Sequence, residues 1–133
     1  MYRTALFPLF LLLTALVAGC SRPDHEGAIR PKFNQAVAHL CSGDVDACLP
    51  LVDPLFVRAQ GTDAVKIRLG IIATLFKLGQ LSEADARIDE IRIGADKKTA
   101  EVLFSLRDTG KGVWNAQQPA KWVLHEGQWY WTF

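Results

Sequence analysis

The sequence predicts an α+β domain in which N-terminal helices pack on one face of a curved antiparallel sheet of about four strands. Apolar residues recur at helical spacing between residues 63 and 78. Apolar and polar residues then alternate from Ala100 to Arg107, which is typical of a strand with one buried face. The chain ends in two further alternating segments around Glu126-Gly127. Because these strands follow the helices in one run, we expect hairpins to connect them.

The helices begin and end at recognisable residues. Pro31 suits a first helical turn and Gly43 a stop, so we expect the first helix between them. Asp44 can cap a short second helix, and residues 55–58 could form a brief strand. The clearest helix spans residues 63–78, after a cap at Thr62 or Asp63 and before Gly79. Its apolar stripe is widened by three further residues, so we expect the helix to be largely covered: Ile71, Leu75 and Leu78.

The strands are predicted to the level of register. Residues 86–93 form a first strand whose alternation shifts at Asp89-Glu90, which indicates a bulge. A two-residue turn at Glu126-Gly127 makes His125 face Gln128 in the last hairpin. That register places one group of side chains on a single face, namely Ala120, Trp122, Leu124, Trp129, Trp131 and Phe133. Residues 113–119 show no clear pattern.

The tryptophans are the most informative side chains. Trp122, Trp129 and Trp131 are expected to build the core under the helices, and the alternative is an apolar pocket or a contact patch. Trp114 lies in the segment without a pattern and is the better candidate for an exposed anchor that contacts a partner.

The first residues predict export. Arg3 is followed by an apolar stretch and by the small residues Ala18 and Gly19, which is typical of a secretion signal. The segment from Leu16 to Cys20 resembles the bacterial lipoprotein box, with Val17 where many members have Leu. The resemblance implies cleavage after residue 19 and attachment of diacylglycerol and a further acyl chain at Cys20. Several acyl chains anchor a protein stably. Ser21 implies sorting to the outer membrane.

The expected organisation is therefore a signal peptide over residues 1–19, a lipidated tether over residues 20–30 and a single domain over residues 31–133. Without the signal, 14 basic residues balance 14 acidic ones, because Arg3 is the only charged residue removed. A chain without a basic block is not expected to bind nucleic acid. Oligomeric state is not predicted.

Two cysteines remain after Cys20. In an oxidising compartment, Cys41 and Cys48 are expected to form a disulfide. The alternatives are metal ligation together with His39, or a catalytic thiol. The sequence has no second cluster of metal ligands, so we expect neither a metal nor a cofactor.

The order of elements resembles the nuclear-transport-factor-2-like superfamily. The features that carry this resemblance are the helix from Pro31, the break at Gly43-Asp44, the helix ending at Leu78-Gly79, the strand from Ala100 to Phe104, and the last hairpin with Trp122-Val123 and Gly127-Gln128-Trp129-Tyr130. It covers residues 31–133 and implies a sheet that curls into a cone. Enzymes, ligand binders and interaction modules share this fold, so the fold alone does not assign an activity.

Three functional hypotheses follow. The first is a non-enzymatic module on the periplasmic face of the outer membrane that binds a protein, as an inhibitor, an immunity factor or an accessory of an envelope machine. The second is a carrier that holds an apolar small ligand in the cone, against Trp122 or Trp131. The third is a cone enzyme that uses His125 and Tyr130, with both side chains in one cavity. The sequence contains none of the common catalytic motifs, which favours the first hypothesis.

Overall fold

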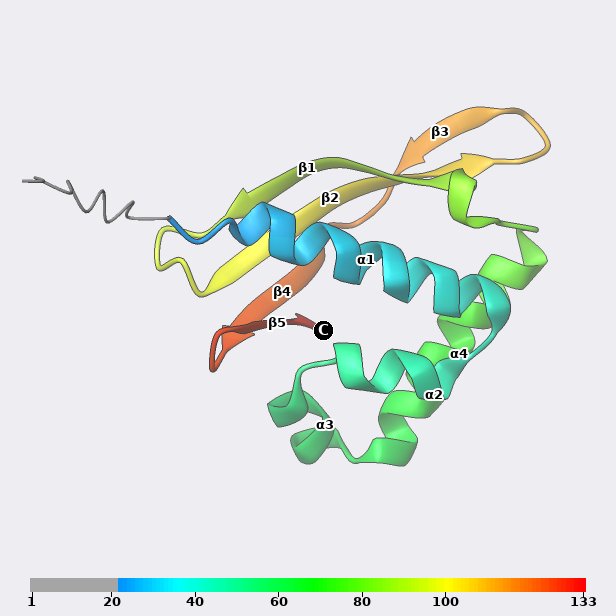
Figure 1. The fold of residues 1–133 in the computed structure, drawn as a ribbon. Coiled ribbons are helices and arrows are strands. Elements are labelled where there is room, and N and C mark those ends of the chain that lie inside the picture. The colour runs from blue at the N-terminus through cyan, green and yellow to red at the C-terminus, as the bar shows by residue number, and fades with distance from the viewer. Residues whose placement is uncertain (1–21) are drawn as a thin grey trace, which may run out of the picture.

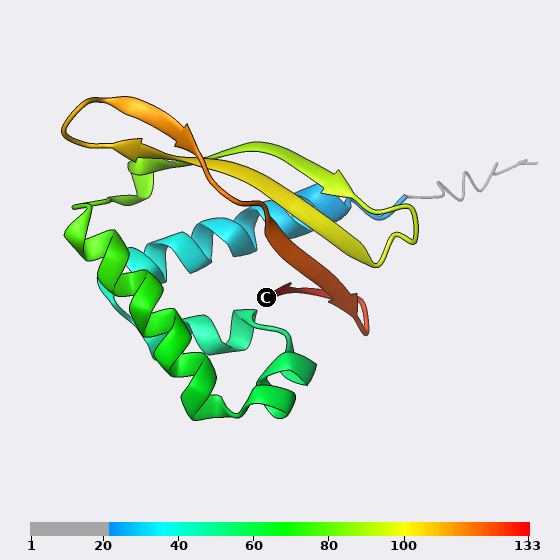
Figure 2. The ribbon, with the colours of Figure 1, turned by 180° about the vertical axis from the view of Figure 1, so that it is seen from behind.

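The computed structural model describes residues 22–133, and these form helices packed against a five-stranded antiparallel sheet (Figures 1 and 2). The expected signal peptide and the lipidation site Cys20 lie outside the described residues. The buried apolar residues form one cluster between Ile29 and Trp129. The described residues therefore share one hydrophobic core. None of the helices in this part of the chain combines the length and hydropathy needed to cross a membrane.

Helix α1 spans His25–Ser42 and begins six residues before Pro31. The Asp24 carboxylate caps it by accepting a hydrogen bond from the backbone N–H of Gly27, at 2.8 Å. The expected helix start at Pro31 is therefore wrong, and residues 25–30 are not a tether. The reason is that Ile29 is fully buried on the same face as Phe33, so the helical period already applies upstream of the proline.

Three further α-helices follow: α2 over Val45–Cys48, α3 over Pro54–Gln60 and α4 over Thr62–Leu78, with a 3₁₀ turn over Leu49–Leu51 between the first two. Asp44 caps α2, as predicted. The expected strand at residues 55–58 is wrong, because the Asp53 carboxylate accepts from the N–H of Leu55 and Pro54 occupies the first helical position. Helix α4 ends at Gly79 as predicted. The expected cap at Thr62 or Asp63 is wrong, because both residues lie inside the helix and Gly61 precedes it without a side-chain cap.

The strands are β1 over Ala86–Ile93, β2 over Thr99–Asp108, β3 over Val113–Ala116, β4 over Ala120–His125 and β5 over Gln128–Thr132. Strand β2 pairs with β1 along one edge and with both β3 and β4 along the other, and β5 pairs with β4. The predicted bulge lies in β1 between Ile88 and Glu90. Strand β3 raises the number of strands to five, one more than expected, and gives regular structure to a segment without a clear pattern.

The last hairpin has the predicted register. His125 pairs with Gln128, Leu124 with Trp129 and Trp122 with Trp131. Glu126 and Gly127 have φ values of 49° and 77°, as a two-residue hairpin turn requires. Trp122 and Trp129 are almost fully buried, and Trp131 packs against the core from a partly exposed position. We call this side of the sheet the inner face, because it is turned towards the helices, and the opposite side the outer face.

The expectation that helix α4 is largely covered is wrong. Helix α4 is buried only along Val65, Leu69, Ala73 and Phe76. Ile71 and Leu78 lie on its other side, where no element of the described structure packs, and Leu75 lies at the border of the two sides; the three are between 58% and 75% exposed. The apolar stripe of α4 is wider than the surface that the rest of the domain offers to this helix, so only half of the stripe is covered.

The expected disulfide between Cys41 and Cys48 is also absent from the structure, where both thiols are free. The Cys48 thiol is fully buried and donates to the backbone carbonyl of Ala36, with an S···O distance of 4.0 Å. Cys41 lies five residues after Ala36 on α1, which turns its side chain by about 140° around the helix. Cys41 is only partly buried, unlike Cys48.

Candidate ligand-binding site

The space between the helices and the inner face of the sheet contains a cavity of about 310 Å³. Helices α1 and α4 form one wall, and strands β2, β4 and β5 form the other. All the lining residues except Gln117 are apolar: Phe33, Ala36, Val37, Leu40, Ile72, Leu75, Phe76, Leu81, Phe104, Leu106, Ala120, Trp122 and Trp131. The cavity opens to solvent, because Leu75 in its wall is 60% exposed.

The cavity wall includes the indole of Trp122 and one polar side chain, that of Gln117. The indole N–H of Trp122 is buried and has no hydrogen-bond partner among the described residues. This nitrogen has almost no accessible surface, so it does not offer a hydrogen bond to a molecule in the cavity. Gln117 supplies an amide from the segment between β3 and β4, and its backbone N–H is held by the carbonyl of Phe104 at 2.9 Å. No charged side chain lines this cavity.

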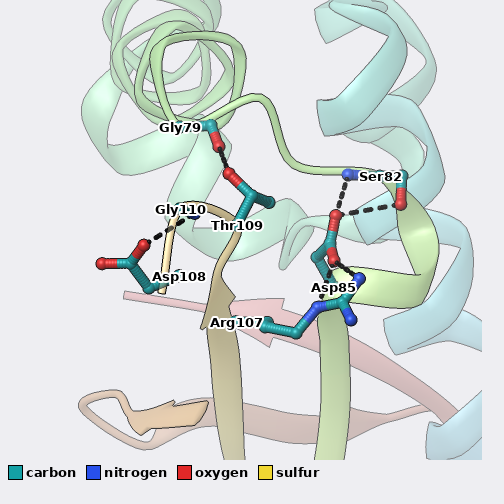
Figure 3. Close-up of polar contacts among 7 residues, drawn as sticks. All are labelled: Gly79, Ser82, Asp85, Arg107, Asp108, Thr109 and Gly110. Carbon is teal, nitrogen blue, oxygen red and sulfur yellow. Dashed lines mark hydrogen bonds and ion pairs between the residues drawn. The ribbon is translucent and has the colours of Figure 1, made fainter. Parts of the chain in front are cut away.

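One edge of the cavity is fixed by a polar network that Figure 3 shows in close-up. The buried Asp85 carboxylate accepts from the backbone N–H of Ser82 at 2.9 Å and from Arg107 Nε at 2.7 Å. These hydrogen bonds, first that of Ser82 and then that of Arg107, hold the pKa of Asp85 below its ordinary value. Thr109 donates to the carbonyl of Gly79 at 3.1 Å. The network joins the end of α4 to strand β2, next to cavity-lining residues of both segments.

His125 and Tyr130 lie close together, but on the outer face. Their rings are 6.3 Å apart, and the alternation along β4 and β5 points both away from Trp122 and Trp131. They are not among the cavity-lining residues, so the expectation that both point into the cone is wrong. The reason is the register itself, which gives the inner face to the tryptophans.

Asp53 lies beside His125, a contact that the sequence did not indicate. Its buried carboxylate lies 3.1 Å from His125 Nε2, while it also caps α3. The backbone N–H of Asp53 donates to the carbonyl of Trp131, which ties the loop before α3 to the edge of β5. Asp53 followed by Pro54 is a typical helix start in sequence. Its contact with His125 could not be predicted, because the two residues are far apart along the chain.

Trp114 is less exposed than expected. It lies in strand β3 opposite Arg107, and the Arg87 guanidinium is 4.5 Å from its ring centre. Arg107 lies 5.9 Å from the same ring. Residues 113–116 are therefore a regular strand, and the guanidinium groups of Arg87 and Arg107 lie close to the indole. No cluster of three or more metal-ligating side chains occurs within residues 22–133.

No protein-family model and no curated protein sequence matches this chain. The structure is similar to the crystal structure of a Campylobacter jejuni protein described as “Putative NTF2-like transpeptidase”, with a TM-score of 0.60. The two sequences are 14% identical, and the alignment covers 79% of this chain and 97% of that chain. At this identity the likeness concerns the fold alone. The described part of the chain has a nuclear-transport-factor-2-like fold, an α+β cone with helices on the inner face of a curved antiparallel sheet.

Proposed function

We propose that this protein is a non-enzymatic binding module that holds an apolar small molecule inside its cone. The observation that carries the proposal is the cavity of about 310 Å³ between α1, α4 and the inner face. Ligand pockets are concave and mostly apolar, with few polar groups that fix the ligand's orientation. The cavity has this composition, with Trp122 and Trp131 in its wall.

The lining also restricts the chemistry of the ligand. A charged group would lose its hydration in a cavity without a compensating charge, so the part of the ligand inside the cavity is uncharged.

Titration of residues 22–133 with the neutral fluorophore N-phenyl-1-naphthylamine tests this proposal. We expect saturable binding of one probe per chain. Ala120 lines the cavity, so Ala120→Phe fills part of it and should weaken binding at least tenfold. Ala116 lies on exposed strand β3 outside the cavity, and Ala116→Phe is the matched control. Equal affinity of both variants would contradict the proposal.

We further propose that the protein is lipidated at Cys20 and faces the periplasm from the outer membrane. The support is the sequence from Leu16 to Ser21. Cys20→Ala should abolish metabolic labelling with palmitate and leave the protein uncut or free of the membrane. Unchanged labelling of this variant would overturn the anchor, independently of the cavity.

Binding of a protein partner is the second candidate function. The observation that favours it is the exposed apolar side of α4, where Ile67 is 67% exposed and Ile71 is 58% exposed. Contiguous exposed apolar residues mark interaction sites in soluble domains. A photo-crosslinking amino acid at Ile71 should form an adduct with the partner in cells, whereas the same group at exposed Lys77, on another side of the helix, should not.

A further inference from the structure

The exposed side of α4 has an arrangement that restricts what can cover it. Ala64, Ile67, Ile71, Leu75 and Leu78 fall within an arc of about 80° when residues advance by 100° around a helix. Each of the four large side chains among them is more than half exposed. These five residues are called the α4 stripe below. Helix α4 has a separate buried side that packs against the core, so the stripe is additional to what the fold requires.

The spacing of the α4 stripe is the same in both directions along the helix. Ile67 and Leu75 each lie four residues from Ile71, and Ala64 and Leu78 each lie seven residues from it. A two-fold axis through Ile71 would therefore bring two antiparallel copies of the helix into register. Ile71 would pack against Ile71, Ile67 against Leu75, and Ala64 against Leu78. Such a self-complementary patch is what an isologous dimer interface needs.

The charges beside the α4 stripe are compatible with this pairing. Arg68 is the one charged residue at its border, and its guanidinium lies 4.8 Å from the ring centre of Phe133 in its own chain. In the antiparallel arrangement the two copies of Arg68 would lie on the same flank of the helix pair, about 9 Å apart along it because each is three residues from the axis, and the opposite flank would carry the uncharged Thr74. Lys66 points to another side of α4, where it forms an ion pair with Asp46 at 2.9 Å.

The same observations disfavour a lipid surface as the occupant. A helix that binds a membrane usually presents free basic residues beside its apolar face. Here the bordering Arg68 is stacked on Phe133. Helix α4 also lies at the end of the molecule opposite the start of α1, as both views show (Figures 1 and 2).

We propose that the α4 stripe is the interface of a symmetric antiparallel dimer of this chain. The proposal requires neither a ligand in the cavity nor the lipid anchor. It rests on the second candidate function, binding of a protein by the exposed side of α4, and names a second copy of this chain as that protein. One helix face is smaller than a standard interface, so the dimer should form reversibly and depend on protein concentration.

Cysteine crosslinking of the purified full chain tests the arrangement. Ile71→Cys should form a disulfide-linked dimer by itself. A mixture of Ile67→Cys and Leu75→Cys should crosslink several times faster than either variant alone, because two copies of residue 67 would lie about 12 Å apart along the helices. Lys77→Cys is the exposed control outside the stripe, and the parent chain gives the background from its native cysteines.

Sedimentation of the full chain supplies the second measurement. The parent should pass from monomer to dimer as concentration rises, and Ile71→Asp should weaken the association at least tenfold while leaving the fold unchanged. The proposal is overturned if the parent stays monomeric throughout, or if Ile71→Cys crosslinks no faster than Lys77→Cys. It is also overturned if Ile67→Cys crosslinks with itself faster than with Leu75→Cys, which would indicate another arrangement.

Discussion

Two apolar faces of this molecule have very different surroundings. The inner face of the β4–β5 hairpin carries Trp122 and Trp129, which the helices cover almost completely. The outer side of α4 carries Ile67, Ile71, Leu75 and Leu78, which are 58–75% exposed. Both faces follow the periodicity of their element. Periodicity therefore identifies which side chains share a face, and the number of neighbouring elements decides whether that face is covered.

The largest expected difference between the two faces is in stability. Trp122→Ala should lower the free energy of unfolding by about 3–5 kcal/mol, because it removes a buried indole from the core. Ile71→Ala should change it by only about 0.5 kcal/mol or less, since that side chain is 58% exposed. Urea unfolding of residues 22–133 at low concentration, where a dimer does not form, measures both. Similar losses would show that the α4 side is covered.

The second prediction concerns acid stability. The pKa of the Asp85 carboxyl is depressed in the folded state, first by the N–H of Ser82 and then by Arg107. Its contribution to stability is therefore present above its ordinary pKa of 3.8 and is lost as the pH falls through the lower folded value.

Asp85→Asn should lower the melting temperature at pH 7 and flatten its decline below pH 4. Asp108→Asn, which changes an exposed carboxylate in the neighbouring turn, is the control in thermal melts. A melting curve for Asp85→Asn that keeps the full acid dependence would contradict this role. Asp89 and Asp96 also have lowered pKa values, so part of the dependence should remain.

The third prediction tests the attachment of α1 to the hairpin. His25 Nδ1 accepts a hydrogen bond from Trp129 Nε1 at 3.2 Å, although the sequence places this histidine in a tether. His25→Ala should cost about 0.5–1.5 kcal/mol of unfolding free energy, as for a typical hydrogen bond. Arg30→Ala, an exposed position on the same helix, should cost less. Equal effects would mean that the hydrogen bond does not stabilise the fold.

The last prediction concerns the relative reactivity of the thiols of Cys41 and Cys48. Burial, and then the charge of Asp44, raises the pKa of Cys48 to about 11, so about one thiol in a thousand is ionised at pH 8. Cys41 is only partly buried, and its pKa is raised less. Iodoacetamide should therefore modify Cys41 before Cys48 in native protein, as followed by mass spectrometry. Complete resistance of both thiols until reduction would restore the expected disulfide.

The elements that the sequence predicts correctly are those with local signals. The turn at Glu126-Gly127 and the alternation on both sides of it determine the register of the last hairpin. Residues whose role depends on distant contacts were missed. Asp85 binds Arg107, which lies 22 residues further along the chain. Asp53 contacts His125 because the loop before α3 is attached to the edge of β5. The cavity itself depends on how far α1 and α4 stand from the sheet, which no local pattern records.

The site was predicted in part for the same reason. Trp122 and Trp131 were identified as members of one face, and they do line the cavity. Trp114 was expected to be an exposed anchor, but the formation of β3 places it beside Arg87 and Arg107. Pairing of β3 with β2 depends on tertiary structure, and the segment's own sequence is too short to indicate it.

The most direct test of the proposed ligand site uses the four tryptophans as reporters. Residues 22–133 labelled with 5-fluorotryptophan should give one fluorine resonance for each of Trp114, Trp122, Trp129 and Trp131. Addition of 1-decanol, a neutral apolar chain, should shift the resonances of the cavity-lining Trp122 and Trp131 and leave that of Trp114 on the outer face unchanged. A saturable shift confined to the first two is the predicted result. Unchanged Trp122 and Trp131 resonances at saturating decanol would contradict a ligand site in the cone.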